Sequence, residues 1–461
     1  MMKELNEGYV LRYLSSVPEF SIQSEAKVLF STTKLHLTDP SITASELSQT
    51  AGMSIDDIRN LYRNMQADPT IQAIVQSPFY SRRLMTNFAR STVRDWIADP
   101  EYASKLLQGE SVMSRTLEFH ATRGSCDYTC TMCLWSDKQQ FTYGKRQLDS
   151  FGLMDNQNWQ TVMRQAYDMG TRTIVFSGGG EPLLKRDIFE LIRTARETGL
   201  KTQLYTNGFS LDRLSEDSWK EALQMEQLRI SMHSPTEDIY NRIVDLPESI
   251  HALSKVSENI RELLARRQSQ GGSVKVGIGF LTQTLNYSQI EQMADFASNL
   301  GVDFLDIRQD EVNITRNLHL DERIVVARQL VNIRAKALHG EFGSISVDMS
   351  DDLTALANDV EQETRVANEC FMKKLRPAIS PYGVVGPCDL KVEPRFAAPV
   401  TLFGNAKKET MPLIAEKMLQ KQIPANCAEC MPSGRTGNAI FTKLLRDFEA
   451  GIDYKDQPFN F

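Results

Sequence analysis

The pattern of hydrophobic and polar positions changes character near residue 115. Before that point, the stretch SITASELSQTAGMSIDDIRNLYRNM has apolar residues at helical spacing, and Gly52 divides it into two short helices. We therefore predict a helical N-terminal domain over residues 1–112.

From residue 115 onward, short apolar runs of strand length alternate with amphipathic helical stretches such as DNQNWQTVMRQAYDMG and RDIFELIRTARETG. The strand-like runs are TLEFHAT, TIVFSGGG, TQLYTNG, LRISMH, VKVGIGFLT and FLDIR. This alternation predicts a parallel α/β architecture over residues 113–342. In such folds the chemistry gathers at the carboxyl ends of the strands, where the glycine and polar motifs of this chain fall.

A helical stretch, DERIVVARQLVNIRAKALHG, leads into a third region over residues 343–461. Within it, LRPAISPYGVVGPC predicts a strand, a turn at Pro381-Tyr382-Gly383 and a second strand ending in Cys388. We expect a small α+β domain here.

Composition narrows the class of protein. The 461 residues are 41% hydrophobic and 24% charged, which is typical of a globular protein, and the net charge of −7 gives no basis for nucleic-acid binding. No apolar run has membrane-spanning length and no secretory signal is visible, so we expect a cytoplasmic protein with no membrane partner. The seven cysteines are an odd number, which argues against a disulfide framework.

The first three cysteines follow the first predicted strand with the spacing Cys126-x3-Cys130-x2-Cys133. Thiolates favour zinc or iron–sulfur centres. A closed zinc site needs four ligands, and no histidine follows these cysteines. Three thiolates on a four-iron cluster leave one iron open to a ligand. Zinc binding and redox sensing are the alternatives.

This spacing after the first strand resembles the hallmark of the radical S-adenosylmethionine (SAM) superfamily. The resemblance implies a partial (β/α)6 TIM-like barrel, with a [4Fe–4S] cluster on the three cysteines and SAM at the open iron. It implies that an electron from flavodoxin or ferredoxin splits SAM into methionine and a 5′-deoxyadenosyl radical. Family members usually place an aromatic residue against the adenine before the last cysteine; this chain has Met132 there, with Trp135 nearby.

The resemblance extends to the next strand ends. FSGGGEPL resembles the family's GGE motif, in which Gly179, Gly180 and Glu181 would take the SAM ammonium group. Asn207 and Ser231, after the third and fourth strands, are expected near the ribose and carboxylate of SAM. A plain turn is the alternative for Asn207.

Two further strands carry candidate residues. Gly277 and Gly279 resemble the family's adenine-contacting glycine strand, with crowding at the barrel seam as the alternative. Arg308 is expected to bind the SAM carboxylate or the substrate, unless it forms a structural ion pair. Asp310, His233 and Arg308 are the candidates for acid–base catalysis.

The remaining cysteines, Cys370-x17-Cys388 and Cys427-x2-Cys430, complete a four-thiolate set. Zinc and iron–sulfur both fit this set chemically. Its context resembles the auxiliary-cluster twitch module, a short form of the SPASM extension, and the aminocyclitol dehydrogenases of the butirosin pathway in particular. The resemblance implies an auxiliary [4Fe–4S] cluster.

The helical N-terminal region, FSGGGEPL, YTNGFSL and DIRQD together resemble the SAM-dependent deaminases of the desosamine pathway. The implied function is hydrogen abstraction from a carbohydrate or aminocyclitol. An alcohol would be oxidised to a ketone in aminoglycoside-type secondary metabolism, and the auxiliary cluster would accept the second electron. Radical elimination of water or ammonia is the close variant.

Two other classes of protein stay open. A ribosomal-peptide maturase would carry a leader-binding domain and usually more C-terminal cysteines. A helix-turn-helix iron–sulfur sensor would need a basic recognition helix, but residues 41–72 hold four acidic residues and two arginines.

Overall fold

A computed structural model describes most of residues 99–442. The described residues are 99–122, 124–133, 152–310, 318–350, 353, 370–392, 401–423, 438 and 441–442. The N-terminal domain expected over residues 1–112 therefore lies almost wholly outside them, as do Trp135, Cys427 and Cys430.

One sheet organises the described residues, with the strand order β10-β9-β8-β1-β2-β3-β4-β5-β6-β7. The strands are β1 (Thr116–His120), β2 (Thr173–Ser177), β3 (Lys201–Thr206), β4 (Gln227–Ser231), β5 (Lys275–Thr282), β6 (Phe304–Gln309), β7 (Ser346–Met349), β8 (Ala378–Ile379), β9 (Val384–Gly386) and β10 (Gly404–Asn405). Strands β1 to β7 pair in parallel, and β8 pairs in parallel with β1. Antiparallel pairing begins only at β9 and β10.

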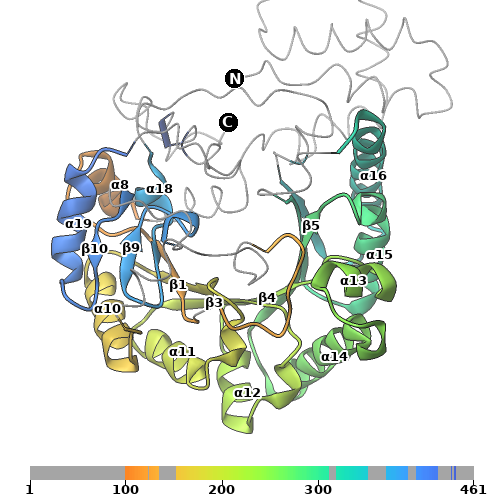
Figure 1. Ribbon diagram of the computed structural model, residues 1–461, viewed down its shortest axis with the longest axis horizontal. Helices are drawn as coiled ribbons and strands as arrows, with labels where there is room; N and C mark the ends of the chain where they lie inside the picture. Colours follow the sequence, from red (N-terminus) through yellow and green to blue (C-terminus); the bar gives the residue numbers. More distant parts are fainter. Residues whose placement is uncertain are drawn as a thin grey trace, which may run out of the picture.

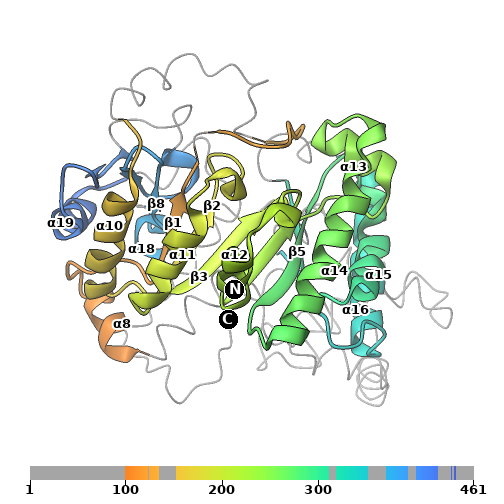
Figure 2. The same ribbon diagram turned by 90° about the horizontal axis from the view of Figure 1, so that it is seen from below.

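The connecting helices form an outer layer around the curved sheet, which Figures 1 and 2 show from two directions. They are α10 (Asn156–Asp168), α11 (Ile188–Glu197), α12 (Glu216–Leu223), α13 (Glu237–Val244), α14 (Ala252–Gln270), α15 (Ile290–Leu300) and α16 (Leu320–Leu338). Outside this repeat lie α8 (Pro100–Leu107), α18 (Met372–Leu375) and α19 (Met411–Gln420).

The predicted partial (β/α)6 barrel is confirmed. Each of the six predicted strand runs forms one of β1 to β6, and each predicted amphipathic stretch forms a helix. The sheet is not closed, because β7 and β10 end its strand order. The carboxyl ends of β1 to β6 therefore meet along one rim of an open, curved sheet.

Aromatic packing joins the first repeat to the sheet. Asp155 caps α10, and its carboxylate accepts a hydrogen bond from the backbone N–H of Asn158 at 2.7 Å. From this helix Trp159 reaches the ring of Phe119 on β1, with 4.6 Å between ring centroids. Phe119 also meets Phe176 of β2 edge-on at 5.9 Å. These buried rings fix the relative heights of β1 and β2, whose carboxyl ends carry the cysteines and the glycine run.

The C-terminal strands join the same sheet. The expected boundary at residue 342 falls between α16 and β7, and β7 continues the parallel pairing of the barrel. The predicted strand–turn–strand around Gly383 is confirmed by β8 and β9. Because β8 lies beside β1, the C-terminal cysteine region is attached at the strand that leads into the first cysteine cluster.

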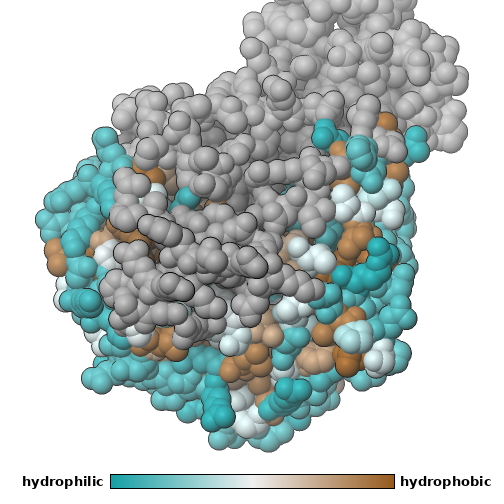
Figure 3. Space-filling view, viewed as in Figure 1, coloured by the Kyte–Doolittle hydropathy of each residue, from teal (hydrophilic) through white to brown (hydrophobic). Residues whose placement is uncertain are grey.

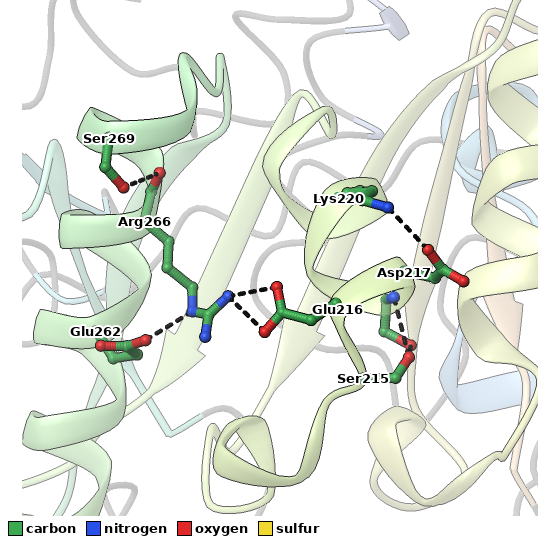
Figure 4. A network of polar contacts seen from close by, with 8 residues as sticks. Ser215, Glu216, Asp217, Lys220, Glu262, Arg266 and Ser269 are labelled. Atoms are coloured by element: carbon green, nitrogen blue, oxygen red, sulfur yellow. Dashed lines mark hydrogen bonds and ion pairs between the residues drawn. The ribbon is translucent and has the colours of Figure 1, made fainter.

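Hydrophilic residues dominate the described outer rim (Figure 3). Arg266 of α14 pairs with Glu216 of α12 at 3.0 Å and with Glu262 of its own helix at 2.6 Å (Figure 4). Such exposed pairs contribute little to stability, because solvent screens them. Among the described helices, none has the length and apolar character needed to cross a bilayer.

Candidate radical SAM site

The cysteine loop that follows β1 is attached directly to the glycine run that follows β2. The backbone N–H of Gly124 donates to the carbonyl of Gly179, and the N–H of Glu181 donates to the carbonyl of Ser125 at 2.7 Å. Two loops that are about 55 residues apart along the chain therefore form one unit beside Cys126.

This contact explains the glycine run. Gly178, Gly179 and Gly180 all have positive φ, at 38°, 69° and 142°. A Cβ on Gly180 would lie 2.9 Å from the backbone nitrogen of Ser125 and nearer still to its carbonyl oxygen. The glycines that we predicted to contact SAM allow the two backbones to approach each other.

A second attachment holds the other side of the cysteine loop. The N–H groups of Thr129 and Thr131 donate to the carbonyls of Val244 and Ile243, at 3.2 and 2.9 Å. These carbonyls belong to the last turn of α13, where no intrahelical donor is available. The hydroxyl of Thr129 also donates to Asp245 at 2.8 Å. The loop therefore spans from the end of β2 to the end of α13.

The carboxylate of Glu181 ties the end of β2 to the end of β3. It accepts hydrogen bonds from the Thr206 hydroxyl at 2.6 Å and from the backbone N–H groups of Asn207 and Leu183 at 2.7 and 2.9 Å. Burial raises its pKa to about 7, while these three donors act in the opposite direction. A carboxylate offers about four acceptor positions, and these donors fill three of those of Glu181.

Asn207 lies between this carboxylate and the first cysteine. Its side-chain Nδ2 is 3.7 Å from Cys126 Sγ, and its Oδ1 accepts from the N–H of Phe209 at 2.9 Å. The backbone N–H of Tyr128 donates to the same sulfur at 3.4 Å. The structure therefore places Asn207 beside a thiol.

The three cysteines fit an iron–sulfur cluster by their donor chemistry. Burial raises the pKa of Cys126 to about 11, and burial together with the charges of Cys133 and Cys126 raises the pKa of Cys130 well above its usual value. A metal centre that replaces these protons would relieve the repulsion between the thiolates. Within the described part of the chain, no three His, Cys, Asp or Glu side chains surround one metal position. A four-iron cluster does not need three ligands around one metal position, because each thiolate binds a different iron.

Met132 contacts the end of β5. Its sulfur lies 3.8 Å from Nε2 of the buried Gln283. The Oε1 of Gln283 is also buried and has no hydrogen-bond partner among the residues described. A buried acceptor beside the methionine suits a ligand with N–H groups, such as an adenine.

The glycines of β5 make room for neighbouring side chains. Arg229 of β4 extends across Gly279 to Asp306 of β6, with 3.0 Å between Nη1 and Oδ2. A Cβ on Gly279 would lie 3.2 Å from Nε of Arg229, and a Cβ on Gly277 would collide with the Phe304 ring. The packing alternative for these two glycines thus has direct structural support.

Arg308 takes part in the same ion pairing. Its guanidinium pairs with Asp306 at 2.9 Å. Burial raises the pKa of Asp306, but the two guanidinium groups of Arg308 and Arg229 more than offset this and hold it below its usual value. Asp310, one residue beyond β6, is buried and bonds through its N–H to Thr282. Ser231 ends β4, which is separated from β6 by β5.

His233 accepts a backbone hydrogen bond. Its Nδ1 lies 3.2 Å from the N–H of Leu281, and Asn286 Nδ2 donates to its carbonyl at 2.7 Å. Burial, with the charge of Arg229, lowers the pKa of His233 to about 3. The ring is therefore neutral, and one of its nitrogens joins β4 to β5.

The first two C-terminal cysteines lie on either side of β8 and β9. Cys370 is buried, and its N–H donates to the carbonyl of Ile423 at 2.8 Å. Ile423 precedes Cys427 by four residues, so the chain returns to Cys370 just before the final pair. Cys388 follows β9 and is partly exposed.

A buried charged group inside the barrel was missed by sequence reasoning. Glu118 of β1 pairs with Arg376 at 2.7 Å and accepts from Ser177. Arg229 stacks on Tyr205 with 3.7 Å between its guanidinium carbon and the ring centroid. Polar residues at alternate positions of a strand, such as Arg229-x-Ser231, could have indicated that these side chains point into the barrel.

Comparison with known families identifies the domain that this rim belongs to. Residues 123–311 match the model of the Radical SAM superfamily, so the chain contains a radical SAM domain. Enzymes of this superfamily use a [4Fe–4S] cluster and SAM.

Individual relatives are distant. A probable GTP 3′,8-cyclase from Sulfurisphaera tokodaii is 26% identical over 182 residues, which are 39% of this chain and 51% of that protein. The chain thus spans about half the length of this curated relative.

Solved structures are also similar. SuiB of Streptococcus suis bound to S-adenosylmethionine has a TM-score of 0.49 at 15% identity, over 78% of this chain and 77% of that one. BtrN in complex with AdoMet and 2-DOIA has a TM-score of 0.28 at 13% identity, over 76% and 98% of the two chains.

Proposed function

We propose that this protein is a radical SAM enzyme whose first cluster is held by Cys126, Cys130 and Cys133. The observation that carries the proposal is the attachment of the cysteine loop to the ends of β2 and α13, inside the residues that match the superfamily. When bound, the cluster supplies the electron that splits SAM into methionine and a 5′-deoxyadenosyl radical.

The residues around the loop have distinct tasks in this proposal. Glu181 keeps one acceptor position for the SAM ammonium group, next to the backbone of Gly179 and Gly180. Gln283 offers its buried Oε1 to the adenine beside Met132. Both groups are positioned before any ligand arrives, which lowers the entropy cost of binding.

The proposed substrate is a carbohydrate or aminocyclitol, oxidised from alcohol to ketone. The four C-terminal cysteines support this, because an auxiliary [4Fe–4S] cluster on Cys370, Cys388, Cys427 and Cys430 would accept the second electron. The return of the chain to Cys370 at Ile423 is compatible with one shared site. Flavodoxin or ferredoxin is the proposed reductant.

The proton from the substrate hydroxyl needs a base. Arg308 lies in β6, Asp310 directly follows β6, and His233 follows β4. The neutral His233 ring already accepts the Leu281 N–H, and Arg308 pairs with Asp306. We propose Asp310 as the base, because it is a buried carboxylate directly after β6, and a carboxylate can take up a proton.

Iron and sulfide content after anaerobic reconstitution tests the cluster assignment. We expect about eight irons per chain in the wild type, and about four in a Cys126/Cys130/Cys133→Ala variant that no longer cleaves SAM. A Cys370/Cys388→Ala variant is the matched control, and it should lose iron while keeping the first cluster. A wild type with about four irons, all lost in the first variant, would contradict the auxiliary cluster and favour redox-neutral elimination.

A substrate screen distinguishes the candidate substrates. Candidate aminoglycosides, sugar nucleotides, a short precursor peptide and GTP are incubated with enzyme, reductant and SAM, and deoxyadenosine is measured. Deoxyadenosine above background only with the peptide would replace the carbohydrate proposal by the maturase alternative.

A further inference from the structure

Asn207 is held both through its side-chain oxygen and through its backbone. Its Oδ1 accepts from the Phe209 N–H at 2.9 Å, and its backbone N–H donates to the buried Glu181 carboxylate at 2.7 Å. The residue is itself buried, with 7% of its surface exposed. Since Oδ1 is occupied, the donor end of the amide is left to face Cys126.

The sulfur of Cys126 therefore faces two N–H donors. One is the backbone N–H of Tyr128 at 3.4 Å, which any residue at that position would supply. The other is Nδ2 of Asn207 at 3.7 Å, which depends on the side chain. Asn207 thus adds a side-chain donor to the backbone donor that the Cys126 sulfur already has.

We infer that Asn207 is a positioning residue that sets the reduction potential of the cluster on Cys126. The inference rests on the proposed function. It differs from the ribose or carboxylate contact that the sequence suggested, because the amide acts on the cysteine sulfur and has its effect before SAM binds.

The physical reason is the stabilisation of charge on sulfur. Reduction adds an electron to the cluster and raises the negative charge that the cysteine sulfurs carry. An N–H dipole directed at sulfur stabilises the reduced form more than the oxidised form, so it raises the potential. Removing this donor should lower the potential while the three thiolate ligands stay in place.

Three variants separate this effect from damage to the turn after β3. Asn207→Leu removes the donor and the acceptor. Asn207→Asp keeps an oxygen for the Phe209 N–H but has no donor. Asn259→Leu is the matched control, because Asn259 Nδ2 supports the same turn through the carbonyls of Gly208 and Phe209, at 2.8 and 3.3 Å, without touching sulfur.

The experiment is a potentiometric titration of the anaerobically reconstituted full chain without SAM, followed by electron paramagnetic resonance. The Cys370/Cys388→Ala background removes the auxiliary signal. At the wild-type midpoint, we expect the ratio of reduced to oxidised cluster to fall about threefold or more in both Asn207 variants, and to stay unchanged in Asn259→Leu.

Asn207→Asp should give the larger fall, because it adds a negative charge. Equal potentials in the wild type and in Asn207→Asp, at equal iron content, would overturn the inference, even if Asn207→Leu fails to fold. A wild type that binds no iron at the first three cysteines would overturn the proposed function as well, so the two failures are distinguishable.

Discussion

Burial sets the charge of the single residues at the strand ends. Glu181 and His233 both have a pKa displaced by burial, in opposite directions, because burial disfavours whichever form is charged. Glu181 gains a pKa near 7 and can exchange a proton near neutral pH, whereas His233 stays neutral and accepts a backbone N–H.

The neutral His233 predicts a dependence of stability on pH. Its pKa is lower in the folded protein, about 3, than the usual 6.5 of an unfolded chain. The stability it contributes is therefore complete above pH 6.5 and is lost as the pH falls toward 3. The wild type should lose free energy of unfolding when the pH falls from 7 to 5. His233→Asn keeps an acceptor near the position of Nδ1 but does not titrate, so its loss should be smaller by about 2 kcal/mol.

Urea unfolding at the two pH values measures this difference, since every other group titrates in both proteins. Parallel pH profiles would contradict the neutral buried ring. The same variant tests the catalytic candidate: full formation of the ketone product by His233→Asn would exclude His233 as the base.

At the scale of elements, the site depends on the contact between the loop that follows β1 and the loop that follows β2. Hydrogen bonds join Gly124 to Gly179 and Ser125 to Glu181, and the glycine run leaves space for this contact. The cysteine loop therefore takes its shape from a neighbouring loop as well as from its own residues.

Gly180→Ala should disturb this contact. The new Cβ would meet the Ser125 backbone at a φ of 142°, so we expect about 1 kcal/mol of backbone strain plus about 1–3 kcal/mol of overpacking. Gly301→Ala is the control, because its φ of 80° is also positive but nothing lies within 4 Å. Thermal unfolding and iron content after reconstitution provide the measurements.

We expect Gly301→Ala to show only the strain, with full iron content. Gly180→Ala should melt lower and bind less iron at the first cluster. If the two variants melt alike and bind equal iron, the close contact between the loops does not shape the cysteine loop.

At the scale of the whole molecule, a buried ion pair connects the C-terminal region to the barrel. Arg376, two residues before β8, pairs with Glu118 of β1 at 2.7 Å. Burial would raise the pKa of Glu118, but Arg376, His120 and Ser177 hold it well below its usual value. The pair therefore joins the segment between Cys370 and Cys388 to the strand that leads into Cys126.

Arg376→Met should leave Glu118 ionised and buried without its partner, which costs about 3–5 kcal/mol. The double variant Glu118→Gln/Arg376→Met should recover part of this loss. Lys105→Met, which breaks an exposed pair with Glu101, is the control and should lower the melting temperature far less, because solvent screens that pair. Equal melting temperatures for Arg376→Met and Lys105→Met would show that the buried pair does not stabilise the attachment.

The sequence alone predicted the repeating part of the fold. The six strand–helix alternations predicted from the spacing of apolar residues match β1 to β6 and their helices. This spacing can be read locally, because each strand of a parallel sheet is buried on both faces and therefore forms a short apolar run. The sequence also placed Cys126, Cys130 and Cys133 after the first strand and the glycine run after the second. These positions follow directly from the order of residues along the chain.

Only the tertiary structure decided which residues meet across the barrel. The Asn207 contact with Cys126, the Arg229 contact with Asp306 over Gly279, and the attachment of β8 to β1 join residues far apart in the chain. A side chain's partner depends on strand order and register, and local spacing does not encode these. The sequence therefore determined which chemistry the chain carries, and the fold determined which groups surround it.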